Sequence, residues 1–318
     1  MPYRSLSLLL LLFCHLLVGA QPTKANYFRV VPLGVTGGLD ESNLSAYLVA
    51  PAGSDLYYSL DAGTLYFGIR AAIRNGVFKG SPSQVLRTQI EGYLITHAHL
   101  DHVAGLIMNS PADGHKTIYA MAPAIHTLIT HYFTWESWAN FGDKGQKPAL
   151  NKYHYQIMDQ DSLYPLPPTG MTVQAFPLSH GNIQSTAFLI KSRGRYLLYL
   201  GDTGEDSLEK STDLHTLWEK VTPLLKNNLL KGIFIEASFP DDQPDHLLFG
   251  HLTPKFLMKE LEDLAALAGA KNLRGLNLIV IHRKPPEDHM ATIKKELERE
   301  NRLKVHLIFP IQGHPFKL

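Results

Sequence analysis

The stretch that decides the fold is EGYLITHAHLDHVAGL at residues 91–106. A short apolar run, typical of a buried β-strand, is followed there by four polar side chains within six positions: His97, His99, Asp101 and His102. Alternate side chains of an extended chain point the same way, so His97, His99 and Asp101 can share one side before a helix begins near His102. The alternative is a solvated, histidine-rich loop. Imidazole and carboxylate groups at this spacing favour a metal site, with zinc as the expected ion and manganese or iron as alternatives.

Four other apolar runs also end in a group that could bind a metal or transfer a proton. The runs VQAFPLS, YLLYLG, GIFI and NLIVI lead into His180, Asp202, Glu236 and His282, respectively. Strands buried in a layered sheet share exit edges, and open α/β sheets place their sites in the crevice beyond those edges. We therefore expect these side chains to converge with the His97 cluster, although they lie far apart in sequence.

The pattern of apolar residues predicts an α/β layer architecture. Short apolar runs that read as strands recur between residues 27 and 310. Helix-like segments lie between several of them, at 82–90, 102–110, 214–229, 253–269 and 286–301. The last two of these have apolar residues at three- and four-residue steps. Sheets covered by helices fit this mixture better than an all-β barrel does.

The first twenty residues, MPYRSLSLLLLLFCHLLVGA, resemble a secretory signal peptide. They contain one basic residue, a leucine-rich run and the small residues Gly19 and Ala20, so we expect cleavage after Ala20. A retained membrane anchor is the alternative. Residues 21–318 would then form one domain that is periplasmic or secreted, with no membrane attachment after cleavage.

The amino-acid composition limits which atoms could bind a metal and which partners are expected. The only cysteine, Cys14, lies inside the predicted signal peptide, so the remaining chain would hold a metal through nitrogen and oxygen alone. The full chain has 30 basic and 29 acidic residues. This balance gives no indication of a nucleic-acid partner, which would favour a basic surface.

The segment THAHLDH resembles the signature of the metallo-β-lactamase superfamily. That resemblance implies an αββα sandwich and places further metal ligands at His180 in LSHGN, Asp202 in LGDTG and His282 in IVIHRKP. Asp61 in LDAGT matches an aspartate that orients ligands in this superfamily without binding the metal. The matching motifs extend from residue 61 to residue 282, which is most of the chain.

Within the superfamily, several segments resemble the class II cyclic-nucleotide phosphodiesterases: VTGGLDESNLSAYLV, LDAGT, ITHAHLDHVAGL, STAFLI, IEASFP and GHLTP. The resemblance implies hydrolysis of cyclic AMP, and often also cyclic GMP, to the 5′-nucleotide. It also implies two divalent ions, most simply Zn²⁺, and a hydroxide between them as the nucleophile. The implied ligands are His97, His99 and His180 for one ion, Asp101, His102 and His282 for the other, and Asp202 as the bridge.

A proton donor for the departing 3′-oxygen is still needed. Glu236 in IEASF and His251 in FGHLTP resemble a Glu–His pair of the tRNA 3′-processing endonucleases, in which the carboxylate would orient the imidazole and raise its basicity. Structural roles, as a strand-end residue and a loop histidine, are the alternative for the two residues.

Two further questions stay open at this point. The aromatic segment HYFTWESWANFG at 131–142 could stack on a nucleobase or could supply core contacts. The scaffold could also serve a β-lactamase, a lactonase or a nuclease, because fold alone does not fix the reaction. A noncatalytic periplasmic protein that binds metal or nucleotide is a more distant alternative.

Overall fold

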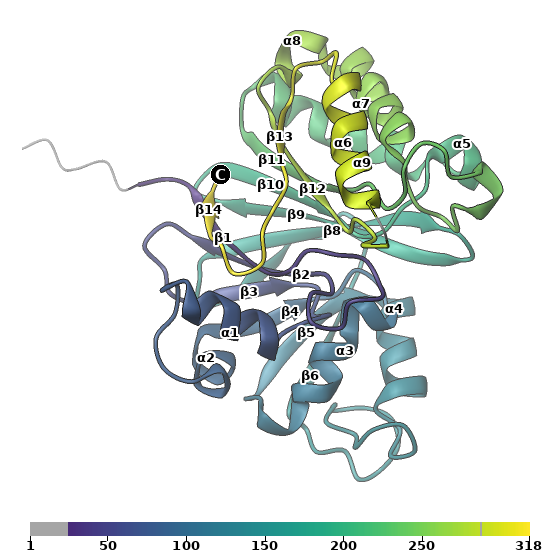
Figure 1. Cartoon of the computed structure of the whole chain (residues 1–318). Helices are drawn as coiled ribbons and strands as arrows, with labels where there is room; N and C mark the ends of the chain where they lie inside the picture. Colours follow the sequence, from purple (N-terminus) through teal and green to yellow (C-terminus); the bar gives the residue numbers. More distant parts are fainter. Residues whose placement is uncertain (1–24, 287) are drawn as a thin grey trace, which may run out of the picture.

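The computed structural model describes residues 25–286 and 288–318. Two seven-stranded sheets face each other, and helices cover the outer face of each sheet (Figure 1). The αββα sandwich expected from the sequence is therefore confirmed. The predicted signal peptide at 1–20 lies outside the described residues. None of the helices within the described ranges has the length and apolar character that a membrane span requires.

The first half of the chain builds one sheet and its helices. The strand order in this sheet is β14-β1-β2-β3-β4-β5-β6, with antiparallel pairing up to β3 and parallel pairing from β3 to β6. The strands are β1 (Phe28–Gly34), β2 (Ala46–Pro51), β3 (Tyr57–Leu60), β4 (Ile90–Leu94), β5 (Lys116–Met121), β6 (Tyr153–Met158) and, from the end of the chain, β14 (Phe316–Lys317). The helices are α1 (Tyr66–Arg74), α2 (Pro82–Gln89), α3 (Leu100–Asn109) and α4 (Ala122–Thr127), and a π-helical turn (Leu128–Tyr132) continues α4.

The second half repeats this plan. The strand order is β13-β12-β11-β10-β9-β8-β7, antiparallel from β7 to β10 and parallel from β10 to β13. The strands are β7 (Tyr164–Leu166), β8 (Met171–His180), β9 (Ile183–Ser192), β10 (Arg195–Leu200), β11 (Leu230–Glu236), β12 (Asn277–Ile281) and β13 (His306–Ile308). The helices are α5 (Asp206–Glu209), α6 (Asp213–Lys226), α7 (Pro254–Ala268), α8 (Ala270–Leu273) and α9 (His289–Glu300).

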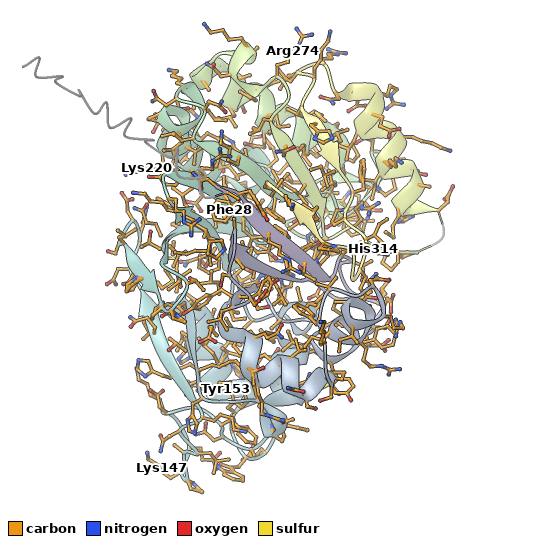
Figure 2. The ribbon with its side chains drawn as sticks, turned by 90° about the vertical axis from the view of Figure 1, so that its left-hand side faces the viewer. Phe28, Lys147, Tyr153, Lys220, Arg274 and His314 are labelled. Atoms are coloured by element: carbon orange, nitrogen blue, oxygen red, sulfur yellow. The ribbon has the colours of Figure 1, made fainter. Side chains whose placement is uncertain are left out.

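Three apolar layers hold the sandwich together. One layer lies between the two sheets, where Tyr47 of β2 packs edge-on against Phe234 of β11 with ring centroids 5.6 Å apart. The other two lie between each sheet and its own helices. Figure 2 shows Phe28, a residue of the layer between the sheets, near the middle of the molecule, with Lys147 and Arg274 toward opposite ends. Burial on both faces explains why the strands read as nearly continuous apolar runs.

The aromatic segment at 131–142 has mainly structural contacts. Phe133 is fully buried and its ring centroid lies 6.5 Å from that of Phe141. Trp135 Nε1 donates to the carbonyl of Pro148, and Trp138 Nε1 donates to Ser110 Oγ. The core interpretation of the sequence pattern therefore holds for Phe133. The segment begins at the end of a π-helical turn and continues as irregular structure.

A buried carboxyl group in α7 should make the stability of the folded protein depend on pH. Glu260 is 2% exposed and accepts hydrogen bonds from Trp218 Nε1 (2.9 Å) and the backbone N–H of Asp206 (3.3 Å). Burial raises the pKa of Glu260 from its ordinary 4.5 to about 7. The folded state therefore binds more protons than the unfolded chain between these two pH values, and stability falls as pH rises through this window.

We expect Glu260→Gln to keep an acceptor for Trp218 and to remove this pH dependence. From pH 5 to pH 8, the free energy of unfolding of the unsubstituted protein should fall by about 1–3 kcal/mol more than that of the variant. Urea unfolding at both pH values measures the difference. Glu262→Gln, at an exposed position of the same helix, is the control. Identical pH slopes for Glu260→Gln and the unsubstituted protein would contradict the prediction.

Candidate active site

All seven side chains expected to bind metal lie together at one edge of the sandwich. His97 and His99 follow β4, and Asp101 and His102 occupy the first turn of α3. From the other sheet, His180 ends β8, Asp202 follows β10 and His282 follows β12. The predicted convergence of strand ends is therefore seen, and the donors come from both halves of the chain.

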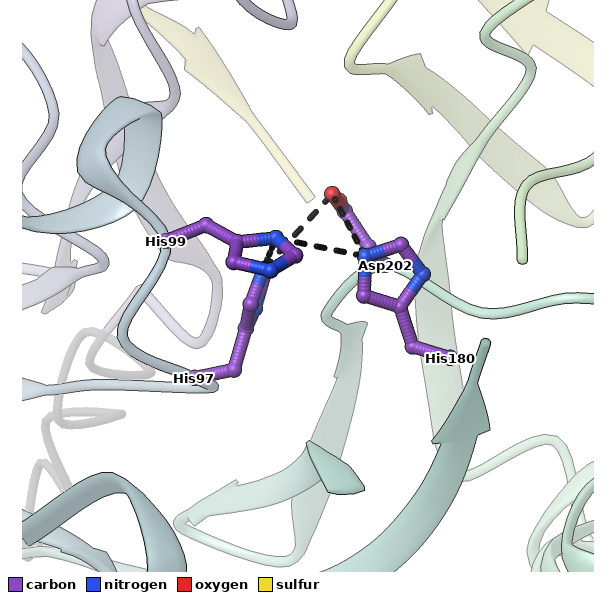
Figure 3. A group of neighbouring side chains, drawn as sticks. All are labelled: His97, His99, His180 and Asp202. Atoms are coloured by element: carbon purple, nitrogen blue, oxygen red, sulfur yellow. Dashed lines mark hydrogen bonds and ion pairs between the residues drawn. The ribbon is translucent and has the colours of Figure 1, made fainter. Parts of the chain in front are cut away.

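One group of donors consists of His97, His99, His180 and Asp202 (Figure 3). One nitrogen or oxygen from each of them lies within 4.8 Å of the others. His97 Nε2 lies 3.1 Å and His180 Nε2 lies 3.4 Å from His99 Nδ1. Asp202 Oδ2 lies 3.8 Å from His97 Nε2 and 3.9 Å from His180 Nε2. These atoms face a common space that can accommodate one ion.

A second group consists of Asp101, His102, Asp202 and His282. His282 Nε2 lies 3.0 Å from Asp101 Oδ2 and 3.2 Å from Asp202 Oδ2. His102 Nε2 also lies 3.2 Å from Asp202 Oδ2. Asp202 thus belongs to both groups, which is the position that a shared carboxylate would require.

The donor set fits divalent metal ions. The buried His102 Nε2 makes no hydrogen bond to any described residue although it faces Asp202. His180 Nδ1 lies 2.7 Å from the carbonyl oxygen of Gly250, which can only accept, so this nitrogen carries the hydrogen and Nε2 presents its lone pair to the cluster. Burial lowers the pKa of His97 and His180, which favours the neutral imidazole that a metal needs.

Charges within the cluster oppose the effect of burial. Burial alone would raise the pKa of Asp202, but the neighbouring His282 and His102 hold it well below its usual range. Burial would likewise lower the pKa of His102, but the Asp202 and Asp61 carboxylates raise it well above its usual range. Asp202 therefore remains a carboxylate at the centre of the cluster.

Asp61 lies where the resemblance places a ligand-orienting aspartate. Its Oδ2 is 2.8 Å from His102 Nδ1, which leaves His102 Nε2 for the cluster. The backbone N–H of Thr96 donates to Asp61 Oδ1 (2.8 Å), and the hydroxyl of Tyr199 donates to Asp61 Oδ2 (2.9 Å). The sequence analysis did not identify Thr96 or Tyr199. Thr96 could have been considered because it directly precedes His97 in the sequence. Tyr199 offered no such clue, because it reaches Asp61 from the opposite sheet.

Glu236 and His251 form the expected pair. His251 Nδ1 lies 2.9 Å from Glu236 Oε1 and 3.9 Å from Asp202 Oδ2. Burial raises the pKa of Glu236 to about 7 and lowers the pKa of His251 to about 4, so burial favours a neutral hydrogen-bonded pair over an ion pair. Ser238 Oγ donates to Glu236 Oε2 and lies 2.9 Å from His282 Nδ1. Ser238 was not identified from the sequence, although it lies two positions after Glu236.

Lys284 adds a cation that sequence reasoning missed. Its half-buried side chain places Nζ 5.5 Å from the centroid of the Phe239 ring. Its charge also contributes to the lowered pKa of His251, after burial and the opposing effect of Asp202. Lys284 makes no ion pair with any carboxylate in the described part of the chain. The ammonium group is therefore available to an anion bound beside the cluster.

Comparisons with known proteins agree with this geometry. Residues 27–313 match the family described as cAMP phosphodiesterases class-II. A 3′,5′-cyclic-nucleotide phosphodiesterase of Aliivibrio fischeri is 42% identical over 96% of this chain and 97% of its own length.

Solved structures show the same fold. Unliganded yeast PDE1 superimposes with a TM-score of 0.81 at 24% identity, covering 92% of this chain and 100% of the yeast chain. The metallo-β-lactamase fold protein YhfI of Bacillus subtilis superimposes with a TM-score of 0.60 at 16% identity, covering 92% of this chain and 100% of that chain. The fold and the family inferred from the sequence motifs are both confirmed. The chain has the metallo-β-lactamase fold and belongs to the class II cAMP phosphodiesterase family of cyclic-nucleotide hydrolases.

Proposed function

We propose that this phosphodiesterase hydrolyses the 3′,5′-cyclic phosphodiester of cyclic AMP and cyclic GMP to the 5′-nucleotide, with two divalent metal ions held by the seven clustered donors. The observation that carries the proposal is the position of Asp202 between two separate donor groups. A single ion would not require donors on both sides of one carboxylate. Zinc is the expected metal because the donors are imidazole nitrogens and carboxylate oxygens.

The protein side chains around the cluster have separate tasks. His97, His99 and His180 would hold one ion, Asp101, His102 and His282 the other, and Asp202 both. When bound, such a pair of ions polarises the phosphoryl group and activates water for in-line attack. Asp61 keeps His102 in the tautomer that presents Nε2.

Protonation of the leaving 3′-oxygen is assigned to His251. Its Nδ1 is engaged with Glu236, so Nε2 is the atom left to face the substrate. Burial disfavours the charged ring, but the negative charge of a bound phosphate beside it opposes this effect. The Glu236 carboxylate stabilises the imidazolium and fixes its orientation. Lys284 supplies a positive charge to the same phosphate.

The experiment is a turnover assay on the purified protein. Cyclic AMP, cyclic GMP, bis(p-nitrophenyl) phosphate and a β-lactam are tested before and after chelation, together with metal analysis. We expect hydrolysis of the three phosphodiesters, none of the lactam, about two ions per chain, and loss of activity on chelation that added zinc restores. Undiminished turnover of a metal-free protein would refute the proposed metal dependence.

We further propose that the protein is exported, to the periplasm or outside the cell, where it would degrade cyclic nucleotides from the surroundings. Support comes from the leucine-rich run and the Gly19–Ala20 pair near the N-terminus. The exported protein should begin at Gln21. Mass spectrometry of the protein from the extracytoplasmic fraction tests this, and a product that still begins with Met1 would contradict cleavage.

A further inference from the structure

A cavity of about 320 Å³ opens beside the donor cluster, on the side of His97 and His99. Pro123 and Ala124 at the start of α4 line one wall, and Asn182 of the β8–β9 turn with Ile183 and Gln184 at the start of β9 line the other. The two walls come from opposite halves of the chain. A group bound here would lie next to the proposed metal ligands, as the remainder of a substrate must when its phosphate lies over the cluster.

Apolar side chains form much of the cavity lining. Pro123, Ala124 and Ile183 offer apolar surface, and the Ile183 side chain is 40% exposed. The volume falls in the range of small-molecule sites, which combine apolar walls with a few polar groups that fix orientation. The aromatic residues at 131–142 do not line this cavity.

Gln184 is the polar group on a rigid element at this wall. It lies in β9, where it pairs with Ser179, and the neighbouring Ile183 pairs with His180. Its Nε2 donates to Met121 Sδ at 3.3 Å, and a thioether sulfur is a weak acceptor. Its Oε1 accepts no hydrogen bond from the residues that the structure describes. The carboxamide can therefore rotate by a half-turn, exchanging Oε1 and Nε2, at little cost in free energy.

We propose that this cavity binds the purine base of the cyclic nucleotide and that the Gln184 carboxamide recognises the base edge, in one orientation for adenine and in the reverse orientation for guanine. The inference rests on the proposed phosphodiesterase function and specifies its substrate class. A carboxamide can accept from the adenine amino group while donating to a ring nitrogen. After a half-turn it can donate to guanine O6 and accept from guanine N1–H.

The decisive variant is Gln184→Glu. A carboxylate only accepts hydrogen bonds. Guanine offers two adjacent donors, N1–H and the 2-amino group, whereas adenine places an acceptor beside its single donor. The ratio of kcat/KM for cyclic GMP to that for cyclic AMP should therefore rise about tenfold or more, mainly through KM. Gln156→Glu, a half-buried glutamine of β6 away from the cavity, is the matched control and should leave the ratio unchanged.

A second variant and a substrate without a base keep the test independent of folding or metal loss. Gln184→Leu should raise KM about tenfold for both cyclic nucleotides. On bis(p-nitrophenyl) phosphate, which has no base, both Gln184 variants should lose at least fivefold less activity than on the cyclic nucleotides that they impair. An unchanged ratio in Gln184→Glu, or an equal loss on all three substrates, would overturn the inference. Failure of the unsubstituted protein to cleave either cyclic nucleotide, while it still cleaves bis(p-nitrophenyl) phosphate, would instead refute the proposed function.

Discussion

Asp202→Asn should reduce kcat/KM for cyclic AMP by about a thousandfold or more and should lower the metal content of the purified protein. Asp202 is 2% exposed and its Oδ2 lies within 4 Å of four imidazole nitrogens from both donor groups. An amide is neutral and offers one acceptor where the carboxylate offers two charged oxygens. Loss of a preorganised charge at a reacting centre typically costs a factor of 10²–10³ or more, and weaker metal binding adds to that cost.

Metal analysis and turnover are measured on the same preparation. Asp242→Asn, in the exposed loop before α7, removes an equal charge away from the cluster and should leave both quantities unchanged. Excess zinc should restore part of the metal content of Asp202→Asn but not its activity, because the missing charge lies between the two groups. If the variant kept two ions per chain and normal turnover, the assignment of Asp202 as the shared ligand would be wrong.

The donor cluster could be predicted because each donor carries a local signal. A strand that is buried on both faces reads as an apolar run, and a histidine or aspartate directly after it is conspicuous. That pattern alone is enough to place His97, His180, Asp202 and His282 at strand ends. His251 has no such signal because it lies in a loop, and only its resemblance to a known motif pointed to it.

Features that depend on contacts between the two halves could not be predicted. Tyr199 reaches Asp61 across the sandwich, and the cavity beside Gln184 exists only because α4 and the β8–β9 turn meet. Lys284 was visible in IVIHRKP, but a lysine after a strand ordinarily lies in solvent. Its position beside Phe239 depends on how a distant loop folds over it.

Strand β5 is difficult to recognise from the sequence, for a physical reason. Strand β5 begins with Lys116, whose buried ammonium pairs with Asp113 and donates to the carbonyl of Leu86. The hydroxyls of Tyr93 and Tyr153 donate to the same Asp113 carboxylate. The hydrogen bonds of this polar network form only in the folded chain, so the sequence alone gives no sign that this lysine is buried.

His251→Ala should lower kcat for cyclic AMP by a factor of about 10²–10⁴ while changing KM little, as expected for a proton donor to the leaving group. The 3′-oxygen of ribose is a strongly basic leaving group and needs that proton. A p-nitrophenolate ion is a weak base and leaves without one. The loss on bis(p-nitrophenyl) phosphate should therefore be at least tenfold smaller than the loss on cyclic AMP, if His251 acts as the acid.

The control is His246→Ala, which replaces an exposed histidine a few residues earlier in the same loop. This variant should behave as the unsubstituted protein does on both substrates.

The comparison of the two substrates distinguishes two possible roles of His251, proton donation and support of the metal ligands. His251 lies 3.9 Å from Asp202, so its removal could disturb the donor cluster instead of removing an acid. A disturbed cluster would slow both substrates equally and reduce the metal content. Equal losses would therefore assign His251 to the support of the metal ligands, and a loss confined to cyclic AMP assigns it to proton transfer.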